Sequence, residues 1–170
     1  MPSPFLVNVG GLRKAAGTRS RQRRAGPLAG LAVTASAVPE GGEVVVEVVL
    51  ESVPGAVLAT GTVAAPWEGA CRRCAGTLSG RLAVAVRELF EERPDPDQTY
   101  PLDGDRLDLA PMARDAVLLE LPLAPLCRPA CQGLCPTCGV DRNEGACTCP
   151  PRRDERWGAL DALAHELKDD

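Results

Sequence analysis

Cysteine is the residue type in this chain whose spacing most clearly indicates chemistry. The sequence contains eight cysteines, and six of them lie within the 23 residues 127–149. These six are Cys127, Cys131, Cys135, Cys138, Cys147 and Cys149, while Cys71 and Cys74 form a separate pair. Thiolates two residues apart, facing a second such pair, are the ligands of a tetrahedral Zn²⁺ site. Eight cysteines therefore suffice for two four-thiolate sites and one or two zinc ions.

The sharpest motif is a zinc knuckle with the sequence Cys-Pro-Thr-Cys-Gly at residues 135–139, where glycine permits the positive φ of such a turn. The spacing predicts one site from Cys135, Cys138, Cys147 and Cys149. The second site, by default, consists of Cys71, Cys74, Cys127 and Cys131. Two alternatives stay open, in which Cys131 joins the knuckle or the pair at 71 and 74 binds no metal. Four cysteine ligands leave no position for an activated water, so both sites would be structural.

A disulfide framework is the competing use of eight cysteines, and it belongs to small secreted chains. Residues 1–30 show no signal peptide, and no segment approaches the roughly 20 apolar residues of a membrane span. We therefore expect a cytoplasmic protein with reduced thiols and no membrane association.

Positive charge is concentrated near the N-terminus. Residues 13–24 contain six basic residues and no acidic one, namely Arg13, Lys14, Arg19, Arg21, Arg23 and Arg24. The rest of the chain has 13 basic and 23 acidic residues, a net charge of −10, within a total of −4. A basic arm of this kind suits RNA phosphates or an acidic partner, although a solvated segment is equally compatible. Arg72 and Arg73 would either contact phosphate or offset the charge of zinc-bound thiolates.

Motifs for catalysis are missing from the sequence. There is no nucleophile elbow, phosphate-binding loop or pair of catalytic carboxylates, and His165 is the only imidazole. We expect a protein that is not an enzyme and has no small-molecule substrate.

Alternating valines predict a strand at residues 43–51, followed by strands at 56–65 and 78–86 with short links. Residues 93–105 read as a loop, and a helix is predicted from Asp108 as N-cap to Pro122. The predicted fold class is α+β, an antiparallel β-meander sheet packed by a helix, with a C-terminal cysteine-rich zinc-knuckle segment. The expected divisions are an N-terminal strand and basic arm (1–30), the meander and helix (31–126), the cysteine cluster (127–150) and a C-terminal helix (151–170).

Taken together, these motifs resemble the YceD family, bacterial and plastid proteins named for large ribosomal RNA subunit accumulation. The resemblance covers about residues 31–163 and includes the 71–74 pair after the meander and the helix ending in Leu-Pro at 121–122. It continues through Cys127, Cys131, Gly133, Leu134, Cys135, Pro136, Cys138, Gly139, Asn143, Cys147, Cys149, Asp154, Arg156, Trp157, Ala159 and Leu160. Arg142 departs from the family, which tends to have leucine there.

The resemblance implies a non-enzymatic role in the synthesis, processing or stability of large-subunit ribosomal RNA. Its expected partners are a ribosomal RNA precursor or large-subunit assembly proteins. A zinc-stabilised binder of RNA or ribonucleoprotein agrees with the residues. One alternative is an adaptor or chaperone for a ribosomal protein, because an acidic body suits basic clients. A dithiol redox protein using Cys71 and Cys74 is a further alternative, although the chain lacks the βαβ setting of that chemistry.

Overall fold

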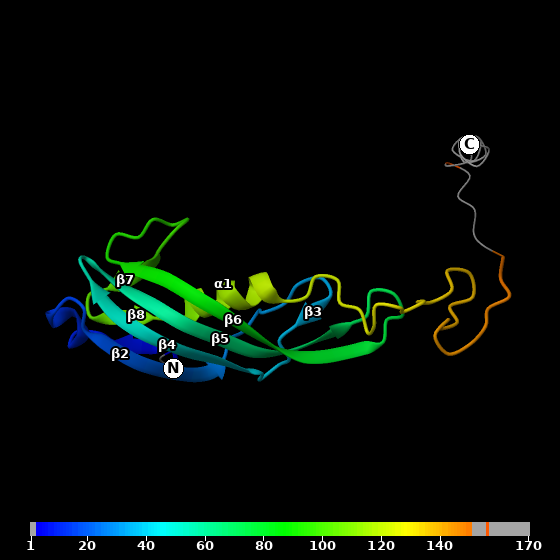
Figure 1. The fold of residues 1–170 in the computed structure, drawn as a ribbon, viewed down its shortest axis with the longest axis horizontal. Coiled ribbons are helices and arrows are strands. Elements are labelled where there is room, and N and C mark those ends of the chain that lie inside the picture. The colour runs from blue at the N-terminus through cyan, green and yellow to red at the C-terminus, as the bar shows by residue number, and fades with distance from the viewer. Residues whose placement is uncertain (1–2, 151–155, 157–170) are drawn as a thin grey trace.

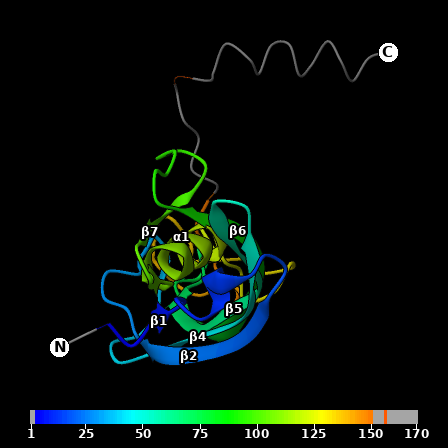
Figure 2. The same ribbon diagram turned by 90° about the vertical axis from the view of Figure 1, so that its left-hand side faces the viewer.

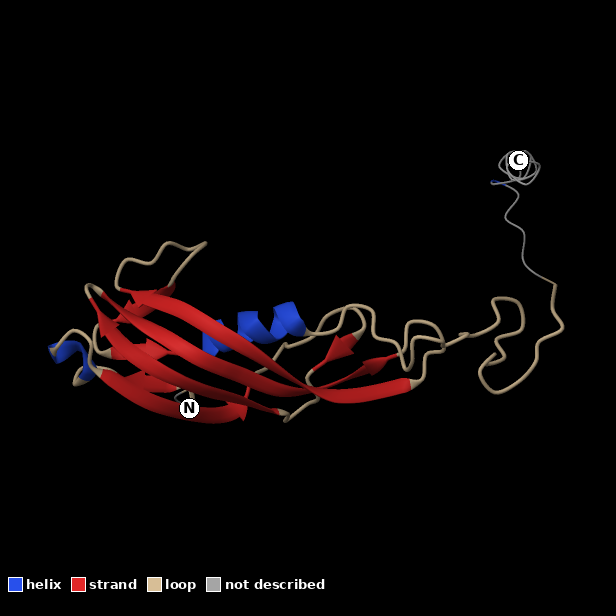
Figure 3. Ribbon diagram, in the orientation of Figure 1, coloured by secondary structure: helices blue, strands red, loops and turns tan. Residues whose placement is uncertain are grey.

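Strands dominate the part of the chain that the computed structural model describes, which comprises residues 3–150 and residue 156 (Figure 3). The strands are β1 (Leu6–Asn8), β2 (Arg19–Pro27), β3 (Ser36–Ala37), β4 (Glu43–Val53), β5 (Ala56–Ala70), β6 (Thr77–Glu91), β7 (Tyr100–Asp103) and β8 (Arg106–Asp108). Within residues 3–150, one 3-10 helix, η1 (Leu12–Lys14), and one α-helix, α1 (Ala110–Glu120), complete the elements.

The three central strands lie where the sequence predicts them. The segments 43–51, 56–65 and 78–86 fall within β4, β5 and β6, which pair antiparallel in this order. Successive side chains of a strand point to opposite faces, so the valine alternation of β4 directs Val44, Val46 and Val48 into the core.

The predicted fold class, an α+β meander packed by a helix, is wrong. The strands form a single sheet in the order β1-β8-β7-β6-β5-β4-β2, with β3 beside β5. This sheet curls into a half-barrel, and α1 lies within its curve (Figure 2). β7 joins β6 in parallel, so residues 93–105 are not purely the predicted loop. The pairing of β1 with β8, far apart in the sequence, depends on tertiary contacts that a local alternation pattern does not contain.

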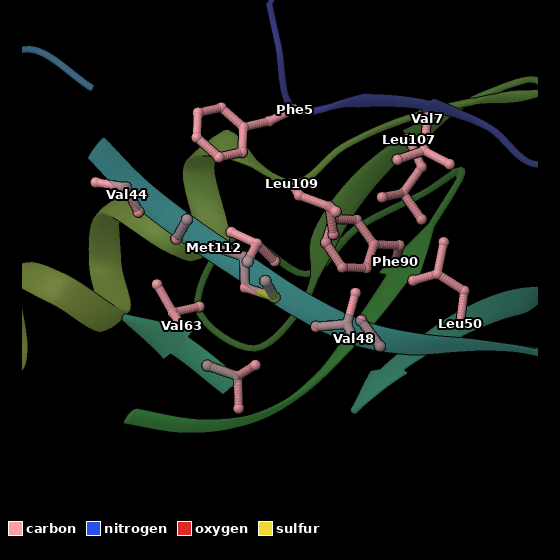
Figure 4. Close-up of a cluster of buried hydrophobic side chains, with 14 of the residues drawn as sticks. Phe5, Val7, Val44, Val48, Leu50, Val63, Phe90, Leu107, Leu109 and Met112 are labelled. Carbon is pink, nitrogen blue, oxygen red and sulfur yellow. The ribbon is translucent and has the colours of Figure 1, made fainter. Parts of the chain in front are cut away.

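The hydrophobic core fills the space between the curled sheet and α1 (Figure 4). Phe5, Phe90 and Leu107 are completely buried there, and α1 contributes Met112 and Val117. The apolar face of the helix therefore serves packing, as a stripe at helical spacing usually does.

The start of α1 differs by one residue from the sequence prediction. Leu109, rather than Asp108, occupies the N-cap position. The Asp108 carboxylate nevertheless accepts a hydrogen bond from the Ala110 N–H at 3.0 Å, which satisfies one of the free N–H groups of the first turn. The helix ends at Glu120, just before the predicted stop at Pro122.

The N-terminal segment is part of the sheet. β1 pairs with β8, and all nine residues of β2 pair with β4. The basic stretch at 13–24, expected as an arm, therefore lies largely in η1 and β2. The domain divisions at residues 30, 126 and 150 stay predictions, and the helix expected within 157–167 falls outside the described residues.

The β5–β6 hairpin extends from one end of the curled sheet and carries the turn 71–76 at its tip (Figure 1). The chain leaves α1, runs towards this tip and continues beyond it as residues 127–150, orange at their far end in Figure 1. We call the turn 71–76 and residues 127–150 the cysteine-rich end, and the sheet with α1 the sheet body. Among the described residues, no helix has the length and apolar character that a membrane span requires.

Candidate metal centre

Four sulfurs meet between the hairpin tip and the segment that follows α1. Cys71 and Cys74 come from the turn between β5 and β6, and Cys127 and Cys131 come from the later segment. The Sγ atoms of Cys71 and Cys131 are 3.9 Å apart, and those of Cys74 and Cys127 are 3.8 Å apart. Cys71 and Cys131 are 2% and 3% exposed, so two of the four cysteines are shielded from solvent. We call this group of four the bridging cluster.

The second group of four, the terminal cluster, is local in sequence. It consists of Cys135 and Cys138 from the knuckle and of Cys147 and Cys149 after a short loop. The Cys147 Sγ lies 3.3 Å from the Cys135 Sγ and 3.4 Å from the Cys138 Sγ. The structure thus brings together the same two groups of four that the spacing indicated, without exchange of Cys131 between them.

Both clusters fit a tetrahedral metal better than a disulfide. In each cluster the four Sγ atoms lie within 4.8 Å of one another, and all eight cysteines are free. A Zn–S bond of about 2.3 Å places tetrahedral sulfurs about 3.8 Å apart, whereas a disulfide requires about 2.05 Å. The bridging cluster matches the tetrahedral spacing, and the terminal cluster is slightly tighter. That an ion is bound, and that it is zinc, stays a prediction.

The two CxxC turns have the same backbone geometry. In each, the residue after the second cysteine donates its N–H to the carbonyl of the first cysteine at 2.9 Å. That residue is Ala75 in the first turn and Gly139 in the second, with φ values of 58° and 75°. The sequence pointed to this conformation at Gly139. Ala75 carries no such signal in the sequence. Alanine rarely adopts a positive φ, and the glycine of this turn, Gly76, comes one residue later.

This turn geometry directs backbone N–H groups at the first sulfur of each pair. The N–H of Cys74, followed by other backbone groups, lowers the pKa of the Cys71 thiol to about 6. The N–H groups of Cys138 and Thr137 lower the pKa of Cys135 to about 5. Such groups favour the thiolate, which is the form that binds a metal.

Sulfur neighbours have the opposite effect elsewhere in the clusters. The Cys131 sulfur is the main cause that raises the pKa of Cys127 to about 12, and the Cys147 sulfur does the same for Cys149. Four thiolates repel one another without a cation, so metal binding by either cluster would release protons.

Asn143 contacts a cysteine of the other cluster. Its Nδ2 donates to the Cys131 Sγ at 3.4 Å, and its Oδ1 accepts from the Gln132 N–H at 2.9 Å and from Arg128 Nη2 at 2.8 Å. Burial alone would raise the pKa of Cys131. Hydrogen bonds outweigh burial and lower this pKa, and the bond from the Asn143 amide is the largest of them. In the sequence, Asn143 stands out only through the family resemblance, because no spacing rule for metal ligands points to an amide.

Arg73 has a structural role in the cysteine-rich end. Its Nη1 donates to the carbonyls of Pro129 at 3.0 Å and Cys131 at 2.9 Å, and its own carbonyl accepts from the Leu134 N–H at 3.0 Å. Arg72 is exposed, and within residues 3–150 its side chain shows no hydrogen bond or ion pair. Of these two arginines, Arg72 is the one that remains available to a partner.

Acidic side chains neutralise half of the basic segment 13–24. Arg13 pairs with Glu92 at 2.6 Å, Arg19 with Glu51 at 3.0 Å, and Arg23 with Glu47 at 2.9 Å. The remaining residues are Lys14, Arg21 and Arg24, none of which forms an ion pair within residues 3–150. Within β2, the register against β4 explains the two pairs, because it places Arg19 opposite Glu51 and Arg23 opposite Glu47.

Comparison with known proteins agrees with the cysteine pattern. Residues 59–164 match the family model described as large ribosomal RNA subunit accumulation protein YceD. This segment covers the β5–β6 hairpin except for the first three residues of β5, together with α1 and both sulfur clusters. The chain belongs to the YceD family.

Relatives come from mycobacteria and plants. The uncharacterized protein Rv2926c of Mycobacterium tuberculosis is 40% identical over 131 residues, which cover 73% of this chain and 63% of that protein. The uncharacterized protein ML1660 of Mycobacterium leprae is 30% identical over 97% of this chain and 80% of its own length. A Zea mays protein named large ribosomal RNA subunit accumulation protein YCED homolog 1, chloroplastic, is 41% identical over 31% of this chain and 18% of its own. No solved structure gives a significant match.

Proposed function

We propose that this protein supports the accumulation of large-subunit ribosomal RNA in the bacterial cytoplasm, as a non-enzymatic, zinc-stabilised binder of RNA or ribonucleoprotein. Membership of the YceD family supports the link to large-subunit RNA, as do the names of the maize and Arabidopsis thaliana relatives. The match with the Mycobacterium tuberculosis relative spans 63% of that protein's length.

The two four-sulfur clusters carry the structural part of the proposal. Bound Zn²⁺ would supply a rigid, redox-inert junction at each cluster. Four thiolates complete the coordination of such an ion, and this supports a scaffold rather than a hydrolytic centre. The bridging cluster would fix residues 127–131 against the hairpin tip, a connection for which this end offers little apolar surface.

Contact with RNA would use the basic side chains that acidic neighbours leave available. Among the basic residues that the sequence predicts as RNA contacts, these include Lys14, Arg21 and Arg24 in the N-terminal segment and Arg72 at the hairpin tip. A phosphate contact releases counterions from the nucleic acid, so affinity should fall with salt by an amount that reports the number of contacts. Arg13, Arg19 and Arg23 already face carboxylates and would contribute less.

The same ion pairs support a second candidate, an adaptor that holds a basic ribosomal protein. Three of the six basic residues are neutralised, and the segment 88–105 carries Glu88, Glu91, Glu92, Asp95, Asp97, Asp103 and Asp105. An acidic surface attracts basic clients and repels RNA.

Binding to precursor large-subunit RNA across a salt series separates the two candidates. The triple variant Lys14→Ala/Arg21→Ala/Arg24→Ala should reduce the slope of log affinity against log salt by about one unit for each lost phosphate contact. The matched variant Arg13→Ala/Arg19→Ala/Arg23→Ala removes the same charge but should change the slope less. Absence of RNA binding by the wild-type protein would favour the adaptor.

Cells lacking the protein test the role itself. We expect them to contain less mature large-subunit RNA relative to small-subunit RNA, and we expect wild-type protein to restore the ratio. An unchanged ratio would contradict the proposed function whichever partner the protein binds.

A further inference from the structure

The two sulfur clusters are connected through the side chain of Asn143. In sequence, Asn143 lies between Cys138 and Cys147, so it belongs to the loop that the terminal cluster closes. In space, its amide donates to the Sγ of Cys131, which belongs to the bridging cluster. Asp141 orients this amide, because its Oδ1 accepts from the Asn143 Nδ2 at 2.6 Å and from the Asn143 N–H at 2.8 Å.

A second connection runs through the backbone between the clusters. The Leu134 N–H donates to the Arg73 carbonyl of the first CxxC turn at 3.0 Å. The Gly133 carbonyl accepts from the Arg142 N–H of the terminal loop at 2.9 Å. Residues 133–134 are therefore held between one cluster's turn and the other cluster's loop.

Space at this junction is restricted. Gly133 has a φ of 72°, and a Cβ there would lie 2.8 Å from the Arg73 carbonyl oxygen. Such a distance is too short for a real side chain, so the contact requires glycine for both its conformation and its size. The relative position of the clusters is therefore defined closely.

We propose that the two metal sites load cooperatively, with Asn143 as the coupling residue. Cys138 and Cys147, when they hold an ion, would keep the loop 139–146 closed, and the closed loop would keep the Asn143 amide against the Cys131 Sγ, a ligand atom of the bridging cluster. This inference rests on the proposed zinc scaffold. It adds that the metal affinity of the bridging cluster depends on whether the terminal cluster is occupied.

The physical basis is the outer coordination shell. Hydrogen bonds to metal ligands orient them and tune their basicity, and their removal typically reduces metal affinity about 10- to 100-fold. Val140, 39% exposed, is the only large apolar residue in the loop 139–146, so burial contributes little to holding Asn143 in place. Hydrogen bonds with Asp141, Gln132 and Arg128 orient the Asn143 side chain, and closure of the loop by Cys138 and Cys147 would hold in place the segment that carries it.

A double-variant cycle on the full chain tests the coupling. Cys138→Ser/Cys147→Ser removes the terminal site, Asn143→Ala removes the coupling residue, and a third protein combines all three changes. Zinc affinity of the bridging site is measured by chelator competition, and cadmium NMR assigns each ion to its cluster. We expect the first two variants to weaken the bridging site about 10- to 100-fold each. The combined variant should be no weaker than Cys138→Ser/Cys147→Ser alone, because both changes remove the same hydrogen bond.

Two further variants separate the hydrogen bond from general damage to the loop. Asn143→Asp retains an acceptor for Arg128 and Gln132 but replaces the N–H that faces Cys131 with a carboxylate oxygen, so it should weaken the bridging site at least as much as Asn143→Ala. Glu144→Gln changes the adjacent side chain, for which no hydrogen bond or ion pair is found within residues 3–150, and should leave the affinity unchanged.

Additive effects in the cycle, or a bridging-site affinity that Asn143→Ala does not change, would overturn the coupling. These outcomes differ from failure of the scaffold itself. A wild-type protein that binds no metal would contradict both proposals, whereas two bound ions with additive effects would contradict the coupling alone.

Discussion

The sheet body and the cysteine-rich end are held together by different physical means. The sheet body buries a continuous core that includes Phe5, Phe90 and Leu109, all completely shielded from water. In residues 127–150, the buried hydrophobic side chains are those of Cys131 and Cys135, while Leu134 and Val140 are 41% and 39% exposed. So little burial contributes little against the loss of conformational entropy, so we expect this end to depend on its sulfurs for a fixed shape.

Removal of metal should produce the largest difference in behaviour between the two regions. Structural zinc contributes about 10–16 kcal/mol in small zinc-finger peptides, so a strong chelator should unfold residues 127–150 and leave the sheet body folded. Hydrogen exchange measured by mass spectrometry should show lost protection in residues 127–150 and unchanged protection in β4, β5 and β6. Added zinc should restore the protection. A chelated protein that keeps protection throughout would show that the cysteine-rich end folds without metal.

A core substitution should show the reverse pattern. Phe90 is 0% exposed, and Phe90→Ala should destabilise the sheet body by about 3–5 kcal/mol through lost burial and a cavity. Thermal unfolding should report a lower midpoint, while the amount of bound metal below that midpoint should stay the same. Leu119 is 86% exposed on α1 and gives the control, because Leu119→Ala should change stability by about 0.5 kcal/mol or less. Loss of metal in folded Phe90→Ala would mean that the two regions are one cooperative unit.

The sequence predicted the local features of both regions better than their connections. The valine alternation identified β4, and cysteine spacing indicated groups of four that the structure places together. The half-barrel was not predictable in this way, because β1 with β8 and β6 with β7 pair through tertiary contacts. Strand pairing also decided which basic residues of segment 13–24 face a carboxylate, and composition alone could not show that.

The contacts that connect the two sulfur clusters could not be predicted from the sequence for a related reason. Asn143 and Arg73 contact Cys131 from 12 and 58 residues away in the sequence, and neither side chain is a usual ligand of zinc. Positive φ at Ala75 opposes the residue's own preference, so the surrounding turn imposes it. Local propensity therefore identifies ligands and strands, but not the groups that fix them relative to one another.

Addition of a single methyl group at Gly133 should disturb the contact between the clusters and weaken metal binding. Gly133→Ala places a Cβ against the Arg73 carbonyl and requires alanine at a φ of 72°, which by itself costs about 1–2 kcal/mol. The variant should release metal at a lower chelator concentration than the wild-type protein. Gly145→Ala is the matched control, because its Cβ would meet nothing closer than 4.0 Å. Equal metal retention by the two variants would show that the junction is looser than its contacts indicate.

The smallest expected effect concerns surface charge on the sheet body. Arg23 and Glu47 lie 2.9 Å apart with side chains 64% and 58% exposed, so water and salt screen their attraction. Arg23→Ala should therefore reduce the free energy of unfolding in urea by about 0.2–1 kcal/mol, and less at high salt. Arg21→Ala serves as the control, because Arg21 lies on the same strand and has no ion pair within the described residues. Arg23→Ala could instead destabilise the protein as much as Phe90→Ala. Charge pairing between β2 and β4 would then matter as much as burial, which would contradict the view that the core alone stabilises the sheet body.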